Sequence, residues 1–294
     1  MHTVSESAFA KINLYLNVEG KRNDGFHTVR TVMHTVSLCD RVSVTVTPAS
    51  QCDIRLSVSG AHGLPTDERN LAVRAAKLFL ERSGKRFHTE ITLEKNLPVA
   101  AGLAGGSSDA AAVLRAMNRL AGKPFTRGAL AVMARELGSD VPYCVLGGTM
   151  LCLGRGEQMT PVAGAPHLFC VIAHAGERVS TPAAYAALDV RFADFDGSMP
   201  FRAPEDCDIF LEKLQNGEIK QGSLYNIFEE VILPQCPGAA ALRENMYAFG
   251  ANAAMMTGSG SAVFGLFSSM EAAEDCAAKL RRAGVFAAAC ESVC

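Results

Sequence analysis

The sequence predicts an α+β fold made of two domains. Strand patterns and helix patterns occur in both halves of the 294 residues, without the strict strand–helix alternation of a doubly wound parallel sheet. This length is enough for one large domain or two ordinary ones. Residues 160–166 contain two prolines and a glycine and are the best candidate for a linker. We therefore expect a domain boundary near residue 155.

The first predicted element is a strand over residues 10–18, in which apolar and polar residues alternate. Lys11 and Asn13 lie on its polar face, about 6–7 Å apart, because side chains two positions apart point the same way. This alternation is typical of a half-buried strand. The remaining strands of this half are predicted at residues 42–46, 54–58 and 89–93, and helices at residues 71–82 and 126–137.

A further helix is predicted directly after a glycine-rich stretch at residues 98–112. Its apolar residues have helical spacing, and Gly122 and Pro124 end it. The apolar run at residues 143–153, interrupted by two glycines, predicts a hairpin. In the second half, strands are predicted at residues 169–173, 262–267 and 285–290, and helices at residues 182–188, 206–215, 226–233 and 270–282.

Composition excludes several classes of protein. Hydrophobic content of 49%, charged content of 20% and a net charge of −2 are typical of a globular protein and argue against a nucleic-acid or anionic membrane partner. No apolar run approaches the roughly 20 residues of a membrane span, and no secretory signal opens the chain. The 10 cysteines form no C-x-x-C pair and no zinc pattern. The scattered cysteines predict a reducing cytoplasm. Our working expectation, which composition does not establish, is a monomer or weak homodimer from a bacterium.

The glycine-rich stretch predicts a polyphosphate site. Glycines 102, 105 and 106 and Ser107 and Ser108 precede the helix, where backbone N–H groups lack intrahelical partners and the helix dipole is positive. The stretch is neither a Walker A loop, because no lysine follows it, nor a G-x-G-x-x-G dinucleotide fingerprint. The alternative is a flexible loop whose serines merely cap a surface helix.

The stretch from Pro98 to Ser108 resembles the phosphate loop of the GHMP kinases, whose pattern is roughly Pro-x-x-x-Gly-Leu-Gly-Ser-Ser. The resemblance implies a GHMP kinase fold with a ribosomal S5 domain 2-like N-terminal domain, a ferredoxin-like C-terminal domain and an active site in the interdomain cleft. It implies an ATP-binding domain at residues 1–155 and a second domain at residues 156–294. It also implies ATP and Mg²⁺ as cofactors.

The same resemblance implies which residues bind ATP. They are Pro98, Val99, Ala100, Ala101, Gly102, Leu103, Ala104, Gly105, Gly106, Ser107 and Ser108 of the loop, together with Asn70 and Lys95. Ala104 departs from the family's glycine, and its methyl group favours a negative φ. Asp109 is a candidate Mg²⁺ ligand or, equally, a residue that interacts with the helix dipole. A glycine turn at residues 257–264 resembles a third family motif that packs against the phosphate loop, or is simply a tight turn before a strand.

Two further motifs imply catalytic residues. Residues 8–14 match the family's Ala-x-Ala-Lys-x-Asn-Leu, which implies that Lys11 is catalytic and that Asn13 contacts the acceptor alcohol. Asp140 matches the aspartate of Gly-Ala-Asp-Val-Pro-Phe, the proposed base, and Pro142 disfavours helix just after it. The alternatives are a solvated strand face for Lys11 and an ordinary loop position for Asp140. Whether Asp140 is an obligatory base or Lys11 chiefly stabilises the transition state stays open.

The acceptor is implied by two segments that resemble one branch of the family, whose members phosphorylate the 2-hydroxyl of a cytidine diphosphate-linked methylerythritol. Phe26 and His27 match the segment that contacts cytosine, and Thr181 and Tyr185 match a later substrate segment. Tyr185 then forms the second side of a cytosine sandwich. The alternatives are core packing for Phe26 and a surface turn for His27. Another GHMP kinase, for homoserine or mevalonate, and a non-catalytic nucleotide sensor are the competing functions.

Overall fold

The computed structural model describes residues 2–193, 203 and 205–293, which form two compact units. Unit 1 comprises Met1–Ala10, Cys39–Val99 and Ala104–Gly147, and unit 2 comprises Lys11–Leu38, Ala100–Leu103 and Gly148–Cys294. The units are interleaved along the chain because two long strands, β1 (His2–Lys21) and β2 (His27–Pro48), contribute to both. A division at residue 155 therefore does not coincide with these units, and the domain boundary stays a prediction.

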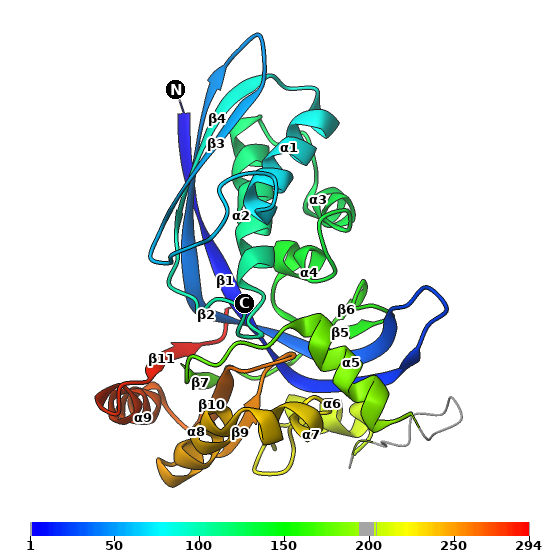
Figure 1. Cartoon of the computed structure of the whole chain (residues 1–294), viewed down its shortest axis with the longest axis vertical. Helices are drawn as coiled ribbons and strands as arrows, with labels where there is room; N and C mark the ends of the chain where they lie inside the picture. The colour runs from blue at the N-terminus through cyan, green and yellow to red at the C-terminus, as the bar shows by residue number, and fades with distance from the viewer. Residues whose placement is uncertain (1, 194–202, 204, 294) are drawn as a thin grey trace. The chain divides into compact units, whose positions relative to one another are not determined.

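In unit 1, helices cover one face of a sheet (Figure 1). Its strands lie in the order β3-β4-β2-β1, with β2 and β4 antiparallel and β3 and β4 parallel. The elements that β1 and β2 join are β3 (Asp53–Ser59), β4 (Phe87–Glu94), α1 (Leu71–Ser83), α2 (Gly105–Leu120), α3 (Arg127–Ala134) and α4 (Val141–Leu146).

The core of unit 1 lies between the sheet and these helices. Ile91 and Leu93 alternate with exposed residues on β4, so they face the same side and are buried with Phe79 of α1. On α2, alanines 110–112 and 116 are fully buried with Leu114, and such small side chains allow adjacent helices to approach closely. The first turn of α2 is therefore placed by an extensively packed helix.

Unit 2 contains a four-stranded antiparallel sheet in the order β11-β7-β10-β9. Helix α8 packs on β9 and β10, and α9 packs on β7 and β11. In chain order these elements form a βαββαβ unit, and the strand order 4-1-3-2 is the ferredoxin-like topology that the sequence predicts for the C-terminal domain. Their bounds are β7 (Phe169–His174), α8 (Pro237–Ala248), β9 (Ala253–Met256), β10 (Val263–Phe267), α9 (Met270–Arg282) and β11 (Phe286–Glu291).

The rest of unit 2 surrounds the parts of β1 and β2 that belong to it. Strand β5 pairs with β2 and with β6, and β8 pairs in parallel with β1 at Tyr15 and Leu16. The remaining elements are β5 (Thr149–Leu153), β6 (Gln158–Pro161), α5 (Thr181–Arg191), α6 (Cys207–Gln215), β8 (Tyr225–Asn226), α7 (Glu229–Ile232) and the 3₁₀ helix η1 (Leu233–Gln235).

Most predicted elements are confirmed, but the hairpin at residues 143–153 is half wrong. Its first part belongs to helix α4, and only β5 is a strand. The expectation that Pro142 prevents a helix at Val141 is also wrong, because proline is tolerated in the first turn. The Arg127 guanidinium donates hydrogen bonds to the carbonyls of Val145 and Leu146, which satisfies the last turn of this short helix.

Other differences concern lengths and omissions. The predicted helix at residues 226–233 is only partly helical, because β8 takes its first residue. The predicted linker at residues 160–166 begins inside β6. Strand β2 is far longer than the predicted residues 42–46, and α8 and β9 have no predicted counterpart. Within the described residues, we find no helix with both the length and the apolar character needed to cross a membrane.

Candidate functional site

Helix α2 begins inside the glycine-rich stretch rather than after it. Ala104 occupies the N-cap position with φ +58°, so the expected negative φ is wrong, and the left-handed conformation costs an alanine about 1 kcal/mol. The Ser108 N–H is bonded to the Ala104 carbonyl at 2.9 Å, which makes the serines part of the first turn and not caps. The helix itself therefore provides no acceptor for the N–H groups of Gly105, Gly106 and Ser107. These three amides are therefore available to a polyphosphate, and their contact with one stays a prediction.

The middle of the loop packs against the glycine turn at residues 257–264, as the sequence predicts. Gly102 has φ +82°, and a Cβ added to it would lie 2.2 Å from the Thr257 carbonyl oxygen. Only glycine fits this approach. The Ala262 N–H also donates a hydrogen bond to the Ala101 carbonyl at 3.1 Å. This part of the loop is therefore held within unit 2 by backbone contacts.

Lys11 and Asn13 form a buried pair on β1. Lys11 Nζ donates hydrogen bonds to Asn13 Oδ1 and to the Gly102 carbonyl, both at 2.6 Å. Asn13 is fixed in turn, because its backbone N–H donates to Thr257 Oγ1 at 3.0 Å and its Nδ2 to Thr31 Oγ1 at 2.8 Å. With exposed fractions of 4% and 2%, the two residues exclude the solvated strand face. The structure thus attaches the predicted catalytic lysine directly to the predicted phosphate loop.

Asp140 lies at the start of a helix as well as after one. It is the N-cap residue of α4, is half-buried, and makes no side-chain capping hydrogen bond. Its carbonyl accepts the Cys144 N–H at 3.0 Å. Because a helix N-terminus favours negative charge, the site is electrostatically suited to a carboxylate. Asp140 belongs to unit 1 and Lys11 to unit 2, so their pairing stays a prediction.

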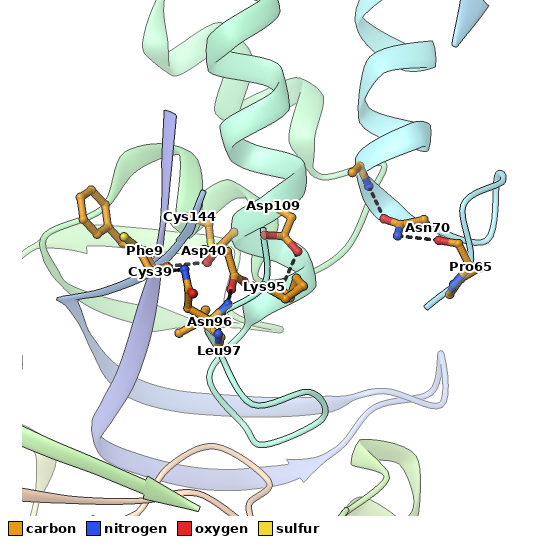
Figure 2. Close-up of polar contacts among 12 residues, drawn as sticks. Phe9, Cys39, Asp40, Pro65, Asn70, Lys95, Asn96, Leu97, Asp109 and Cys144 are labelled. Carbon is orange, nitrogen blue, oxygen red and sulfur yellow. Dashed lines mark hydrogen bonds and ion pairs between the residues drawn. The ribbon is translucent and has the colours of Figure 1, made fainter. Parts of the chain in front are cut away.

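Lys95 lies between two buried carboxylates (Figure 2). Its Nζ donates to Asp40 Oδ2 and, at 2.7 Å, to Asp109 Oδ2 on the first turns of α2. Asp40 Oδ1 accepts the backbone N–H groups of Asn96 at 2.5 Å and Leu97 at 2.8 Å. Burial raises the pKa of Asp109, against the lowering effect of the Lys95 ammonium. The ammonium predicted to bind ATP is thus engaged by the protein's own carboxylates.

The role of Asp109 as a Mg²⁺ ligand stays a prediction. One of its oxygens is bonded to Lys95, and the other, Oδ1, is buried without a hydrogen-bond partner and shielded from solvent. Among the residues that the structure describes, no group of three or more His, Cys, Asp and Glu side chains is arranged to hold a metal ion. Mg²⁺ usually binds through one or two carboxylates plus substrate phosphates, so the phosphates would be its main ligands here.

Two other predicted ATP-binding side chains have structural partners (Figure 2). Ser108 Oγ donates to the Phe9 carbonyl at 2.5 Å, which joins α2 to β1. Asn70 is the N-cap of α1: its Oδ1 accepts the Ala72 N–H at 3.0 Å, and its Nδ2 donates to the Pro65 carbonyl at 2.8 Å. These bonds explain both residues as supports of the site, and their direct contact with ATP stays a prediction.

The residues predicted to bind the acceptor lie in unit 2, and two of them are in contact. The rings of His27 and Tyr185 are stacked, with centroids 4.6 Å apart and planes at 25°, and Phe228 meets Tyr185 edge-on. His27 Nε2 lies 2.6 Å from Asp189 Oδ1, and Lys21 binds the other oxygen of that carboxylate. Although burial opposes it, the hydrogen bonds from Lys21 and His27 lower the pKa of Asp189. His27 is thus a fixed part of a network and not a free surface turn.

Phe26 and Thr181 each have a different partner. Phe26 is 48% exposed and is therefore not a core residue. The Arg155 guanidinium carbon lies 3.4 Å from the centre of the Phe26 ring, a cation–π contact. Thr181, the first residue of α5, is bonded to Ser259 of the glycine turn through their hydroxyls at 2.8 Å.

Sequence reasoning misses four residues of this region: Asp40, Arg155, Asp189 and Ser259. Asp40 binds Lys95, 55 positions away, and Asp189 contacts His27, 162 positions away, so no local sequence pattern predicts either aspartate. Ser259 lies inside the glycine turn that the sequence does single out, and Arg155 lies between two glycines after an apolar run, which is the one signal that could have identified it as a turn residue.

Comparisons with known proteins agree with the family resemblance that the sequence motifs indicate. The family model of the GHMP kinases N terminal domain matches residues 70–148, and that of the GHMP kinases C terminal matches residues 210–285. A 4-diphosphocytidyl-2-C-methyl-D-erythritol kinase of Caldicellulosiruptor saccharolyticus is 40% identical over 262 residues, covering 88% of this chain and 87% of that protein. The enzyme of the same name from Bacillus subtilis is 41% identical over 265 residues, covering 90% and 88%.

Solved structures give the same result. The crystal structure of a 4-(cytidine 5'-diphospho)-2C-methyl-D-erythritol kinase matches with a TM-score of 0.80 at 36% identity and covers 99% of this chain and 100% of that chain. A homoserine kinase from Cytophaga hutchinsonii matches with a TM-score of 0.71 at 21% identity, over 100% and 95% of the two chains, and so shares the fold.

Proposed function

The chain belongs to the GHMP kinases, and within them to the 4-diphosphocytidyl-2-C-methyl-D-erythritol kinases, and on this premise we propose that it transfers the γ-phosphoryl group of ATP to the 2-hydroxyl of 4-diphosphocytidyl-2-C-methyl-D-erythritol. It is an ATP-dependent small-molecule kinase of non-mevalonate isoprenoid synthesis. The structural observation that carries the proposal is the bond of 2.6 Å between Lys11 Nζ and the Gly102 carbonyl, which joins a buried cation to the phosphate loop.

The chemistry of the site follows from charge. A primary or tertiary alcohol is a poor nucleophile, so the Asp140 carboxylate accepts its proton as the oxygen attacks the γ-phosphorus. The Lys11 ammonium stabilises the negative charge that develops on the transferring group. The amides of Gly105, Gly106 and Ser107 bind the remaining phosphates. Mg²⁺, carried by ATP, supplies additional charge neutralisation when bound.

The acceptor is held by its pyrimidine. Tyr185 and Phe26 provide aromatic faces on which a cytosine stacks, and His27 provides a polar edge whose ring is oriented by Asp189. Asn13 and Thr181 contact the methylerythritol part. We expect the protein to act as a monomer or weak homodimer in the bacterial cytoplasm, with no nucleic-acid or membrane partner.

The deciding experiment measures ADP release on addition of the cytidine substrate, with the product mass confirming one added phosphate. Homoserine and mevalonate are the control acceptors, because neither has a base to stack on. Turnover with the cytidine substrate alone is the expected result. Faster turnover with either control would identify another GHMP activity, and ATP binding without ADP release from any acceptor would identify a nucleotide sensor.

A further inference from the structure

Asp40 is a fully buried carboxylate of unit 1 that no motif includes. Its side chain is completely buried, and it accepts three hydrogen bonds from three consecutive residues: Nζ of Lys95 and the backbone N–H groups of Asn96 and Leu97. Both of its oxygens are therefore occupied. These bonds fix the chain just after β4, where it turns into the phosphate loop (Figure 2).

Lys95 extends this attachment to the helix that begins the phosphate site. Its ammonium bonds Asp40 and Asp109, so the end of β4 is tied to the first turns of α2 through one side chain. Gly105, the first residue of α2, lies directly beside the group: a Cβ there would be 3.4 Å from Lys95 Nζ and 3.8 Å from Asp40 Oδ2. The position of the Gly105 amide thus depends on where this ion cluster lies.

Burying this ion cluster costs folding stability, so we expect the cluster to have a role besides stabilising the fold. Burying ions removes their hydration, and apolar residues of similar volume often stabilise a protein as well or better. Two carboxyl groups share one ammonium here, so the cluster brings no excess positive charge to a predicted polyphosphate site. A cluster of this kind suits a device that fixes geometry rather than one that attracts ATP by charge.

We propose that Asp40 is a positioning residue for ATP: through Lys95 and the Asn96 and Leu97 amides it holds the first turn of α2 so that its N–H groups converge on the phosphates. The proposal rests on the proposed function and adds that Lys95 acts through this position and not by touching ATP. The two roles for Lys95 predict opposite changes in KM for ATP when the Asp40 charge is lost. If Lys95 contacted ATP, its ammonium would be released toward the phosphates and KM would not rise. If Lys95 acts by positioning, KM rises.

The test replaces Asp40 by asparagine and measures steady-state kinetics with each substrate varied. The Asp40→Asn side chain keeps its shape but loses its negative charge. The carboxylate that accepted three hydrogen bonds is then gone, and hydrogen bonds to charged groups are strong. We expect KM for ATP to rise about tenfold or more while KM for the cytidine substrate stays within about twofold. Asp53→Asn is the matched control, because Asp53 is a half-exposed carboxylate of β3 in the same unit whose ion-pair partner, Arg55, is exposed.

A second variant keeps the test decisive if Asp40→Asn does not fold, as judged by its melting temperature. Lys95→Arg preserves the positive charge but replaces the compact ammonium beside Gly105 with a larger, planar guanidinium, which changes the geometry of the cluster. The proposal expects a raised KM for ATP in this variant also. An unchanged or lowered KM for ATP in either folded variant overturns the proposal, as does an equal rise for both substrates. Inactivity of the wild-type enzyme would instead refute the proposed function.

Discussion

The Lys11 ammonium lies 2.6 Å from Asn13 Oδ1, two residues farther along the same strand, and both side chains are buried. The ammonium also donates a hydrogen bond to the Gly102 carbonyl at 2.6 Å. These two bonds fix the position of its charge. This is what preorganised stabilisation of a transition state requires.

Replacing Lys11 by methionine tests this relationship. We expect kcat to fall by about two orders of magnitude or more, because a preorganised charge is lost while side-chain volume is kept. Asn13→Leu leaves the bond between Lys11 and Gly102, so a smaller loss is expected. Steady-state kinetics of both variants provide the measurement, with Lys77→Met as a control at an exposed lysine. If Lys11→Met retained the wild-type kcat, Lys11 would have no catalytic role.

Contiguous motifs explain how much of this site could be predicted. Lys11 and Asn13, residues 98–108 and residues 257–264 each lie within one short stretch. Within unit 2, Gly102 contacts both Lys11 and Thr257. The Asp40–Lys95 pair joins residues 55 positions apart, and nothing in the local sequence distinguishes its aspartate. Similarly, Arg155 contacts Phe26 only because β5 and β6 bring their turn to it.

The fold shows the same contrast. Strands with one buried face alternate and were predictable, whereas residues 29–36 of β2 are largely buried on both faces and show no alternation. Helix α8 starts without a side-chain cap of its own. The Glu177 carboxylate accepts the N–H groups of Gly238 and Ala239, both at 2.9 Å, from about 60 positions away. Tertiary contacts therefore decide these elements.

The proposed role of Asp140 as the base can be tested separately from ATP binding. Asp140→Asn keeps the shape of the side chain and removes its basicity, so we expect kcat to fall by about two orders of magnitude or more with little change in ATP affinity. Ser139→Ala, an exposed neighbour that becomes the family residue, is the control. Single-turnover and ATP-binding measurements distinguish the two effects. Turnover like that of the wild type in Asp140→Asn would remove Asp140 from the mechanism.

The aromatic groups of unit 2 predict a selective effect on the acceptor. Tyr185→Ala removes the ring that stacks on His27, and base–aromatic stacking is worth about 1–3 kcal/mol. We expect KM for the cytidine substrate to rise roughly tenfold to a hundredfold, while KM for ATP changes little. Tyr185→Phe retains the ring and is expected to behave nearly like the wild type. Equal shifts for both substrates would contradict a cytosine contact.

A buried histidine makes stability depend on pH. His34 is enclosed between two hydroxyl groups: its Nδ1 lies 2.7 Å from Thr149 Oγ1 and its Nε2 lies 2.8 Å from Ser292 Oγ. Burial and, to a smaller extent, His167 lower the pKa of His34 to about 4 from the ordinary 6.5. The His34 imidazole therefore binds a proton less readily in the folded protein than in the unfolded chain.

The sign of the effect follows from linkage. Above pH 6.5 His34 is neutral in both states and imposes no penalty. Between pH 6.5 and 4 the unfolded chain binds more protons, so the free energy of unfolding falls by about 3 kcal/mol as the pH falls. Denaturant unfolding at pH 7 and at pH 4 measures this loss. His34→Gln, which does not titrate, is expected to lose about 3 kcal/mol less over the same interval, whereas His62→Gln at an exposed position is expected to follow the wild type. Identical pH dependence in His34→Gln and the wild type would show that His34 titrates alike in the folded and unfolded states.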